Sequence, residues 1–156
     1  MDNNDIIRRI RYAFNINDSK MIEIFALGDS KVTRAQISNW LKKDIDPDYV
    51  ALSDFQLAVF LNGFITDKRG KKEGHLPIPE NRLNNNIILR KLKIALNLKD
   101  EDILNLLNLA DLKISKHELS AFFRKPGQSQ YRECKDQIIR NFLKGLQIKY
   151  RENISN

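Results

Sequence analysis

Cysteine is almost missing from this sequence, since Cys134 is the one example among 156 residues. A single thiol cannot form an intrachain disulfide and cannot build a Cys-rich metal cage, so stability has to come from packing. Long hydrophobic runs are also missing, because no stretch approaches the roughly 18 apolar residues of a membrane span. The N-terminus has no basic segment leading into an apolar run, as a secretory signal would. We therefore expect a cytoplasmic protein with no membrane partner.

The charge balance is basic, with 27 Lys and Arg against 20 Asp and Glu and a formal net charge of +7. One interpretation is an electrostatic footprint for nucleic acid or another polyanion, because clustered cations release condensed counterions on binding. The other is solubility, because the charge is spread along the chain. A composition of 42% hydrophobic and 30% charged residues predicts a folded globular protein in either case.

The chain contains an internal repeat. Adding 82 to residue numbers 3–70 gives 85–152 without a gap, and identical residues occur along the whole span. The identities include Asn3 and Asn85, Asn4 and Asn86, Arg8 and Arg90, Asn15 and Asn97, Asp18 and Asp100, Asp29 and Asp111, Asp54 and Asp136, and Gly63 and Gly145. Such a register indicates a duplicated structural unit.

Each copy reads as four helices, because apolar residues recur at helical spacing and strand-like alternation is missing. The second helix of each copy is expected to start with Asp18 or Asp100 as its cap. The third starts with a capping box, Thr33-x-x-Gln36 or Ser115-x-x-Glu118, and Pro126 marks its end in the second copy. The expected core positions of the first copy include Ile6, Ile7, Ile10, Met21, Phe25, Ile37, Trp40, Leu41, Leu57, Phe60 and Phe64, and those of the second include Ile88, Leu89, Leu92, Ile103, Leu107, Leu119, Phe122, Phe123, Ile139, Phe142 and Leu146.

We therefore predict an all-α protein in which two tandem copies of a four-helix unit pack as one compact helical body. The first unit covers residues 1–70 and the second covers residues 83–152, with a Gly- and Pro-containing linker at residues 71–82. Gly63 and Gly145 lie inside the fourth helix, where glycine costs about 0.5–1 kcal/mol relative to alanine. Close approach of a neighbouring helix is the expected compensation.

Catalytic constellations are missing from the sequence. There is no HExxH, phosphate-binding loop or GxGxxG, and no triad can be assembled. His75 lies in the linker, and His117 matches Ala35 in the first unit, so neither histidine belongs to a repeated site. Cys134 matches Leu52 and is expected to be a buried small hydrophobe rather than a nucleophile. We expect no enzymatic activity and no cofactor.

Residues 18–43 have a helix-turn-helix look, with a basic end on the later helix. The second unit repeats the basic end, and a further basic stretch leads into the linker. The candidate phosphate contacts are Lys42, Lys43, Lys68, Arg69, Lys71, Lys72, Arg124 and Lys125. The alternative is that any two packed helices joined by a short turn look like this, and that lysine near a helix C-terminus only complements the macrodipole.

A polar stripe on the first helix of each unit is the sharpest feature of the sequence. At 100° per residue the stripe lies on the side facing away from the apolar face. It comprises Asn4, Arg8, Arg11 and Asn15 in the first unit and Asn86, Arg90, Lys93 and Asn97 in the second. Because exposed positions normally drift after a duplication, we predict a contact surface. The alternative is a structural ion pair of Arg8 with Asp54 and of Arg90 with Asp136.

Several segments carry a family resemblance. They are Asn4–Tyr12, Ala26–Gly28, Phe60–Ile65, Lys68–Gly70, Asn84–Ile87, Tyr131–Cys134 and Phe142–Leu143. Together they resemble the YehS-like bacterial domain-of-unknown-function family, and the resemblance covers nearly the whole chain apart from its last few residues. It implies a bacterial cytoplasmic protein with a duplicated domain. The family carries no established activity, so the resemblance transfers no catalytic residue.

The sequence therefore predicts a non-enzymatic binding protein, with nucleic acid as the expected partner through the basic helix ends. The alternative is a protein–protein interaction or self-assembly module with no nucleic-acid role. Salt separates the two, because nucleic-acid affinity falls steeply with ionic strength and an apolar protein interface depends on it weakly. The first hypothesis also requires the basic residues of the two units to converge on one face.

Overall fold

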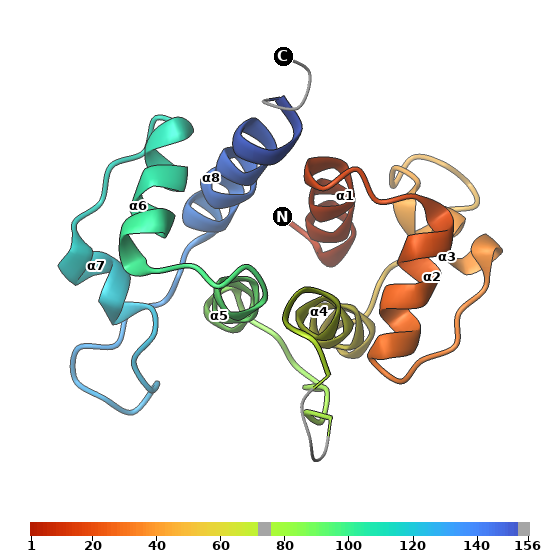
Figure 1. The fold of residues 1–156 in the computed structure, drawn as a ribbon, viewed down its shortest axis with the longest axis horizontal. Helices are drawn as coiled ribbons and strands as arrows, with labels where there is room; N and C mark the ends of the chain where they lie inside the picture. Colours follow the sequence, from red (N-terminus) through yellow and green to blue (C-terminus); the bar gives the residue numbers. More distant parts are fainter. Residues whose placement is uncertain (72–75, 153–156) are drawn as a thin grey trace.

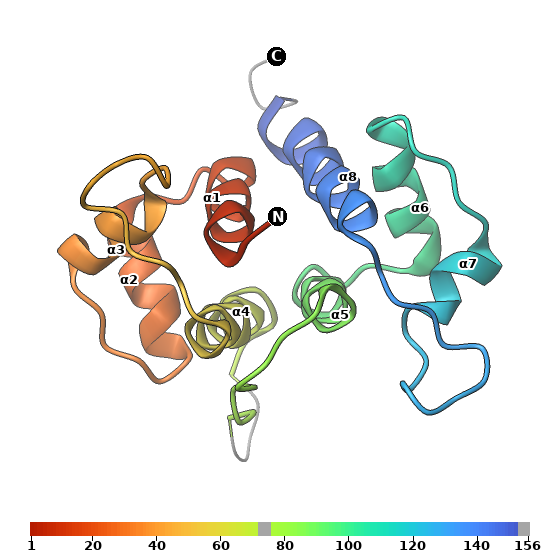
Figure 2. The ribbon, with the colours of Figure 1, turned by 180° about the vertical axis from the view of Figure 1, so that it is seen from behind.

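A computed structural model describes residues 1–71 and 76–152, and within these ranges it contains helices and no strand (Figures 1 and 2). The helices are α1 (Asn3–Ala13), α2 (Asp18–Leu27), α3 (Arg34–Leu41), α4 (Asp54–Arg69), α5 (Asn85–Ala95), α6 (Asp100–Leu109), α7 (Lys116–Ala121) and α8 (Asp136–Leu146), and α8 continues into one π-helical turn, η1 (Gln147–Arg151). The prediction of an all-α protein with two four-helix units is confirmed.

Local side-chain chemistry fixes where the helices begin. In both predicted capping boxes, Thr33 and Ser115 accept from the backbone N–H three residues on, and the side chain there accepts from the cap N–H in return. Helices α2 and α6 start at Asp18 and Asp100 as expected, but the capping role assigned to these two residues was wrong, because the N-cap is the residue before each. Asn17 has the extended conformation a cap needs and accepts from a helix N–H, so Asp18 is already helical, as is Asp100.

Helix α7 is shorter than its counterpart α3 and ends at Ala121, well before Pro126. The chain then forms a 3₁₀-type turn, in which the N–H of Phe122 donates to the carbonyl of Leu119, three residues earlier, at 3.1 Å. Phe122 is nevertheless buried, and Phe123 packs partly buried against the core. Proline therefore did not set this boundary, although both aromatic residues reach the interior as predicted.

The hydrophobic core is continuous through both units. Of the core positions expected from the sequence, most are almost fully enclosed, and Leu41 and Phe123 lie at the edge, partly buried. In the first unit, the ring of Phe25 packs 5.3 Å from both Trp40 and Phe60, centroid to centroid. Burial of this kind supplies the main stabilisation, as expected for a chain without disulfides.

The fourth helix of each unit lies in close contact with the second. A Cβ built on Gly63 would lie 1.9 Å from the Ile24 carbonyl oxygen, and one built on Gly145 would lie 2.1 Å from the Leu106 carbonyl oxygen. Both positions therefore require glycine for helix packing. The expectation that a close neighbouring helix compensates for the helical glycines is confirmed.

The two units pack through their first and fourth helices (Figure 1). Helix α4 packs on α5, while α1 packs on α8 and η1, and these two contacts exchange with each other when residue numbers shift by 82. The segments that enter α1 and α5 obey the same exchange. The Leu83 backbone N–H donates to Asp54 Oδ2 at 2.8 Å, and the Met1 amine donates to Asp136 Oδ2 at 3.1 Å. The units thus resemble a homodimer with approximate two-fold symmetry inside one chain.

Candidate functional site

The asparagines at the start of the predicted stripe hold the fold together and do not face solvent. Asn4 is 2% exposed, and its Nδ2 donates to the Trp40 and Val50 carbonyls at 2.9 Å each. Its Oδ1 accepts from the Leu52 N–H at 2.9 Å. Asn86 is equally buried and makes the three equivalent bonds in the second unit. The prediction that Asn4 and Asn86 face away from the core was wrong, because residues 42–52 and 124–134 cover this side of the helix.

The asparagines at the end of the stripe have a conformational explanation. Asn15 and Asn97 follow α1 and α5 with φ angles of 51° and 53°. This left-handed region is costly for most side chains, and asparagine tolerates it better than most. Their identity in both units therefore follows from the backbone and needs no bound partner.

The alternative ion pairs of Arg8 with Asp54 and of Arg90 with Asp136 were also wrong. Asp54 Oδ1 accepts from Asn3 Nδ2 at 2.7 Å, and Asp136 Oδ1 accepts from Asn85 Nδ2 at 2.8 Å. The hydrogen bond from Asn85 and the nearby Met1 amine hold the pKa of Asp136 below its ordinary value. These contacts explain why Asp54 and Asp136 are identical without involving an arginine.

The four cations of the stripe differ between the units. Arg8 pairs with Asp5, and its Nη1 donates to the Lys42 carbonyl at 2.9 Å. Lys93 donates to Asp100 at 2.9 Å and lies 4.3 Å from the centroid of the Phe123 ring. Arg90 is exposed and makes no hydrogen bond or ion pair to any described residue, whereas Arg11 is half-buried.

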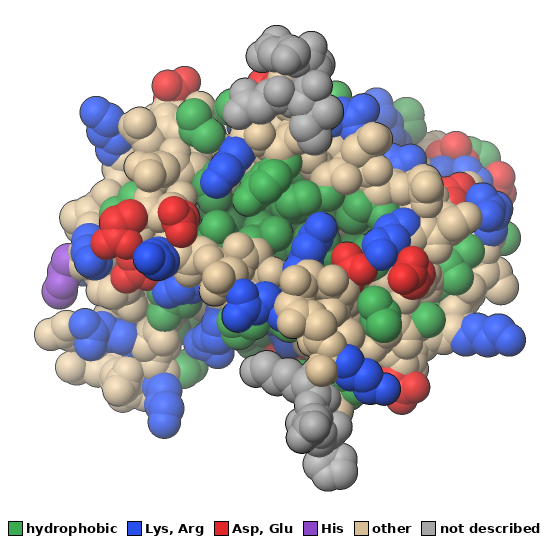
Figure 3. All heavy atoms as spheres, in the orientation of Figure 1, with side chains coloured by type: hydrophobic (Ala, Val, Ile, Leu, Met, Phe, Trp, Pro, Cys, Tyr) green, Lys and Arg blue, Asp and Glu red, His purple; other side chains and the backbone are tan. Residues whose placement is uncertain are grey.

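The basic helix ends do not form one surface. Helices α3 and α7 lie at opposite ends of the long axis of the molecule (Figure 1). Lys42 and Lys43 follow α3 in the chain, whereas Arg124 and Lys125 follow α7. Figure 3 shows Lys and Arg side chains scattered over one face with Asp and Glu among them. The convergence that the nucleic-acid hypothesis requires is missing for these two helix ends.

The third basic cluster leads into the linker, and part of it lies within the described residues. Lys68, Arg69 and Lys71 are exposed, and Lys72 lies outside the described residues, as does His75. The Lys68 ammonium lies 5.4 Å and 5.6 Å from the ring centroids of Phe14 and Phe64. Lys68, one of the candidate phosphate contacts, therefore makes cation–π contacts within the protein.

A concavity with a volume of about 710 Å³ lies along α1. We call it the α1 groove. Its lining residues come from α1 and its N-cap, from the end of α3 and the chain after it, and from η1. They are Asp2, Asp5, Arg8, Arg9, Arg11, Tyr12, Leu41, Lys43, Asp44, Ile45, Tyr49 and Gln147. The groove brings together Arg8, Arg11 and Lys43, which were predicted as parts of two separate surfaces.

Charges of both signs shape the α1 groove. Partial burial raises the pKa of Asp5, but hydrogen bonds from the Asp2 backbone and from Arg8 outweigh this and leave that pKa below its ordinary value. Burial, followed by the nearby carboxylates of Asp2 and Asp44, raises the pKa of the Tyr49 phenol. The Asp5 carboxylate thus stays ionised beside Arg8, and the Tyr49 phenol stays neutral.

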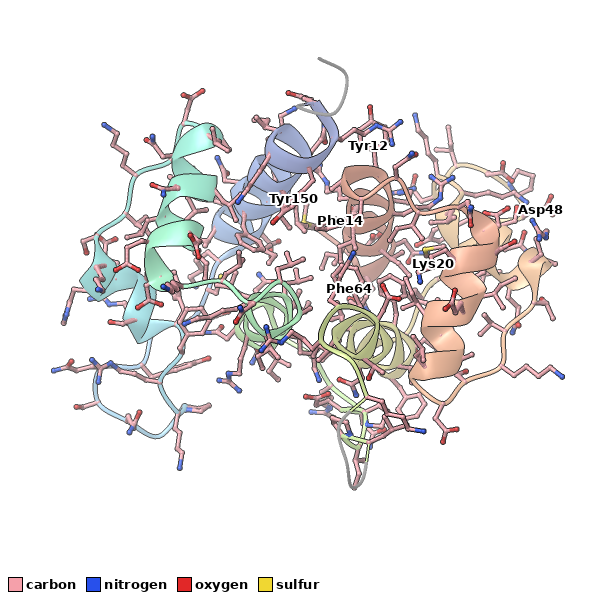
Figure 4. The ribbon with its side chains drawn as sticks, viewed as in Figure 1. Tyr12, Phe14, Lys20, Asp48, Phe64 and Tyr150 are labelled. Atoms are coloured by element: carbon pink, nitrogen blue, oxygen red, sulfur yellow. The ribbon has the colours of Figure 1, made fainter. Side chains whose placement is uncertain are left out.

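Two arginines in the α1 groove have donors to spare. Arg9 makes no hydrogen bond or ion pair within the described chain, and the Nε of Arg11 is buried without an acceptor. Tyr12 stands beside them, 45% exposed, with the Arg151 guanidinium 3.8 Å from its ring centroid. Figure 4 places Tyr12 at the outer end of α1. The groove therefore offers unpaired guanidinium donors next to an aromatic surface.

Cys134 is buried where its counterpart Leu52 is buried, so its predicted place in the core is confirmed. Burial raises the pKa of the Cys134 thiol to about 12. Because the thiolate is the reactive species, we expect native protein at pH 8 to resist a maleimide reagent and unfolded protein to react at once. Mass spectrometry with and without denaturant measures this. Rapid labelling of the native protein would contradict the buried position.

Comparison with known proteins identifies the family. A family model described as a protein of unknown function, DUF1456, matches residues 3–70 and again residues 85–152. The chain belongs to the DUF1456 family. It is also 43% identical over 147 residues to the uncharacterized protein YehS of Escherichia coli strain K12, and the match covers 94% of both chains. The resemblance seen in the sequence is confirmed, and no solved structure matches.

The two DUF1456 matches coincide with the two structural units, so the family domain is one four-helix unit. No described helix is both long and apolar enough to cross a membrane. Nowhere in the described ranges do three His, Cys, Asp or Glu side chains gather in a geometry that could hold a metal ion.

Sequence reasoning missed Arg9, Tyr12 and Gln147 as parts of one site. The neighbouring basic pair of Arg8 and Arg9 was visible, but the helical wheel assigns the two residues to different sides of α1. The groove exists because the chain after α3 and the η1 turn approach α1 from two sides. Hydrophobic periodicity predicts neither approach.

Proposed function

We propose that this DUF1456 protein is a non-enzymatic protein-interaction module that binds a peptide segment of a partner in the α1 groove. The observation that carries the proposal is the open groove in which Arg9 and Arg11 hold unused donors beside the exposed ring of Tyr12. Buried or half-buried guanidinium groups gain most from a carboxylate that completes their hydrogen bonds. We place this interaction in the cytoplasm.

The mixed lining of the groove favours a peptide over a phosphate backbone. Asp2, Asp5 and Asp44 lie among its cations, and such carboxylates repel a continuous row of phosphates. A peptide can offer charges of both signs together with apolar side chains. Ile45, at 86% exposed, supplies an apolar contact on the rim.

A selection from a displayed random-peptide library against the whole chain tests the proposal. We expect bound peptides to lose about tenfold or more in affinity for the Arg9→Glu/Arg11→Glu variant, since both unused cations become repulsive. The matched control is Lys31→Glu/Lys113→Glu, which makes the same charge change at two exposed, equivalent positions outside the groove. This control should keep wild-type affinity.

Nucleic acid is the competing outcome of the same experiment. Random-sequence DNA and RNA are titrated at about 50 mM and 200 mM salt beside the selected peptides. A phosphate-binding surface loses affinity steeply over this range, and both charge-reversal variants would weaken it. Steep nucleic-acid binding with no groove-dependent peptide would overturn the proposal in favour of the nucleic-acid hypothesis.

A further inference from the structure

The linker shows how this fold holds a non-helical segment. Its described part lies across the contact of α4 with α5, where the Pro77 carbonyl accepts from Asn62 Nδ2 at 3.4 Å. Three residues on, Glu80 Oε1 lies 3.0 Å from the ammonium of Lys91. Lys91 is only 8% exposed and also donates to Asn62 Oδ1 at 2.6 Å. A Pro-Ile-Pro-Glu stretch is thus anchored by one buried cation.

The contact of α1 with α8 and η1 is the counterpart of this contact under the shift of 82 residues. Residues 82 positions apart are equivalent in the two units, so Lys91 corresponds to Arg9, Asn62 to Lys144 and Leu83 to Met1. Met1 holds Asp136 as Leu83 holds Asp54, so the two entry segments are placed alike. Arg9, unlike Lys91, has no carboxylate partner within residues 1–71 and 76–152.

The α1 groove opens on the α1 side of this contact. Arg9 lines it together with Gln147, which lies one helical turn after Lys144. Tyr12 lies one turn after Arg9 along α1 and adds an aromatic surface to the same groove (Figure 4). The groove therefore presents Arg9, the counterpart of the lysine that anchors the linker, beside open space.

We infer that the α1 groove binds an extended, proline-containing acidic segment of a partner protein, in the way that the α4 and α5 contact holds Pro77–Glu80. This inference rests on the proposed function and names the class of peptide. The Arg9 guanidinium donates two parallel hydrogen bonds to the carboxylate of the acidic side chain, whereas the ammonium of Lys91 cannot form this bidentate pair. Prolines pre-order the segment, so it loses little conformational entropy, and the Tyr12 ring offers them an apolar surface.

The probe that tests the inference is a fluorescein-labelled peptide with the sequence of residues 76–81, titrated into the whole chain and followed by anisotropy. We expect saturable binding that falls about tenfold or more when Arg9 is replaced by Glu. Changing the peptide glutamate to lysine should cause a similar loss. Combining this peptide with the Arg9→Glu variant should restore binding in part, because the charges are exchanged.

The Arg9→Gln variant is the control for correct folding, because it keeps most of the aliphatic stem and removes the charge. It should unfold at the wild-type temperature and should bind the peptide more weakly than the wild type does. Two results separate the failures. If library-selected peptides need Arg9 and Arg11 but the residue 76–81 peptide does not bind, the inference is overturned and the proposed function stands. If no peptide depends on the groove, both are overturned. Binding unaffected by Arg9→Glu would also overturn the inference.

Discussion

Replacing Gly63 with alanine is expected to destabilise the protein by about 3 kcal/mol, at the upper end of overpacking effects. The new Cβ would lie 1.9 Å from the carbonyl oxygen and 2.9 Å from the carbonyl carbon of Ile24. Because the obstacle is helix backbone and not a flexible side chain, α2 or α4 has to shift as a whole. Urea unfolding followed by circular dichroism measures the change in the free energy of unfolding.

The same experiment can be made in the second unit, where Gly145 is the residue equivalent to Gly63. Gly145→Ala should cost a similar amount, since its Cβ would lie 2.1 Å from the Leu106 carbonyl oxygen. The control is Gly127→Ala, where no atom lies within 4 Å of the added carbon, and the expected change stays within about 0.5 kcal/mol. Wild-type stability of Gly63→Ala would contradict the helix packing described above.

Replacing Asn4 with alanine is expected to cost about 3 kcal/mol. The change removes three hydrogen bonds and leaves the Trp40 and Val50 carbonyls and the Leu52 N–H without a partner in the interior. Each buried group left unpaired costs about 1–3 kcal/mol, although local relaxation and water recover part of the sum. Thermal unfolding should show a loss of about 10 °C for a chain of this size.

Asn86→Ala should behave in the same way, because it makes the equivalent three bonds. Asn105→Ala on α6 is the matched control, since Asn105 is exposed and makes no hydrogen bond to any residue in the described ranges. It should leave stability unchanged or raise it slightly, as alanine favours a helix. If Asn4→Ala kept full stability, the earlier interpretation of Asn4 as part of a solvent-facing contact surface would return.

The repeat made the fold accessible from the sequence, because two copies of each signal agreed. Thr33 and Ser115 predicted the same boundary, and Gly63 and Gly145 predicted the same close approach. The same agreement misled the interpretation of Asn4. A helical wheel describes one neighbour of a helix, whereas α1 is also covered by the chain between α3 and α4, which has no periodicity to read.

The α1 groove depends on tertiary structure in a way that local patterns do not encode. The apolar faces are alike in both units, so the sequence pattern does not predict which face of one unit packs on which face of the other. Lys91 and Arg9 occupy equivalent positions in the sequence, yet Lys91 is enclosed by the linker and Arg9 has no such cover within the described chain. This difference follows from the linker, which crosses the contact of α4 with α5, and it is the basis of the peptide proposal.

Amide chemical-shift mapping of the whole chain with the residue 76–81 peptide decides whether the α1 groove is the peptide site. We predict that the largest shift changes cluster at Arg9 and Tyr12 on α1, at Asp44 and Ile45 after α3, and at Gln147, all of which line the groove. Arg124 and Lys125, which follow α7 in the second unit and do not line the groove, should not change. Changes confined to those two basic residues, or a spectrum that the peptide leaves unaltered, would contradict the assignment of the groove.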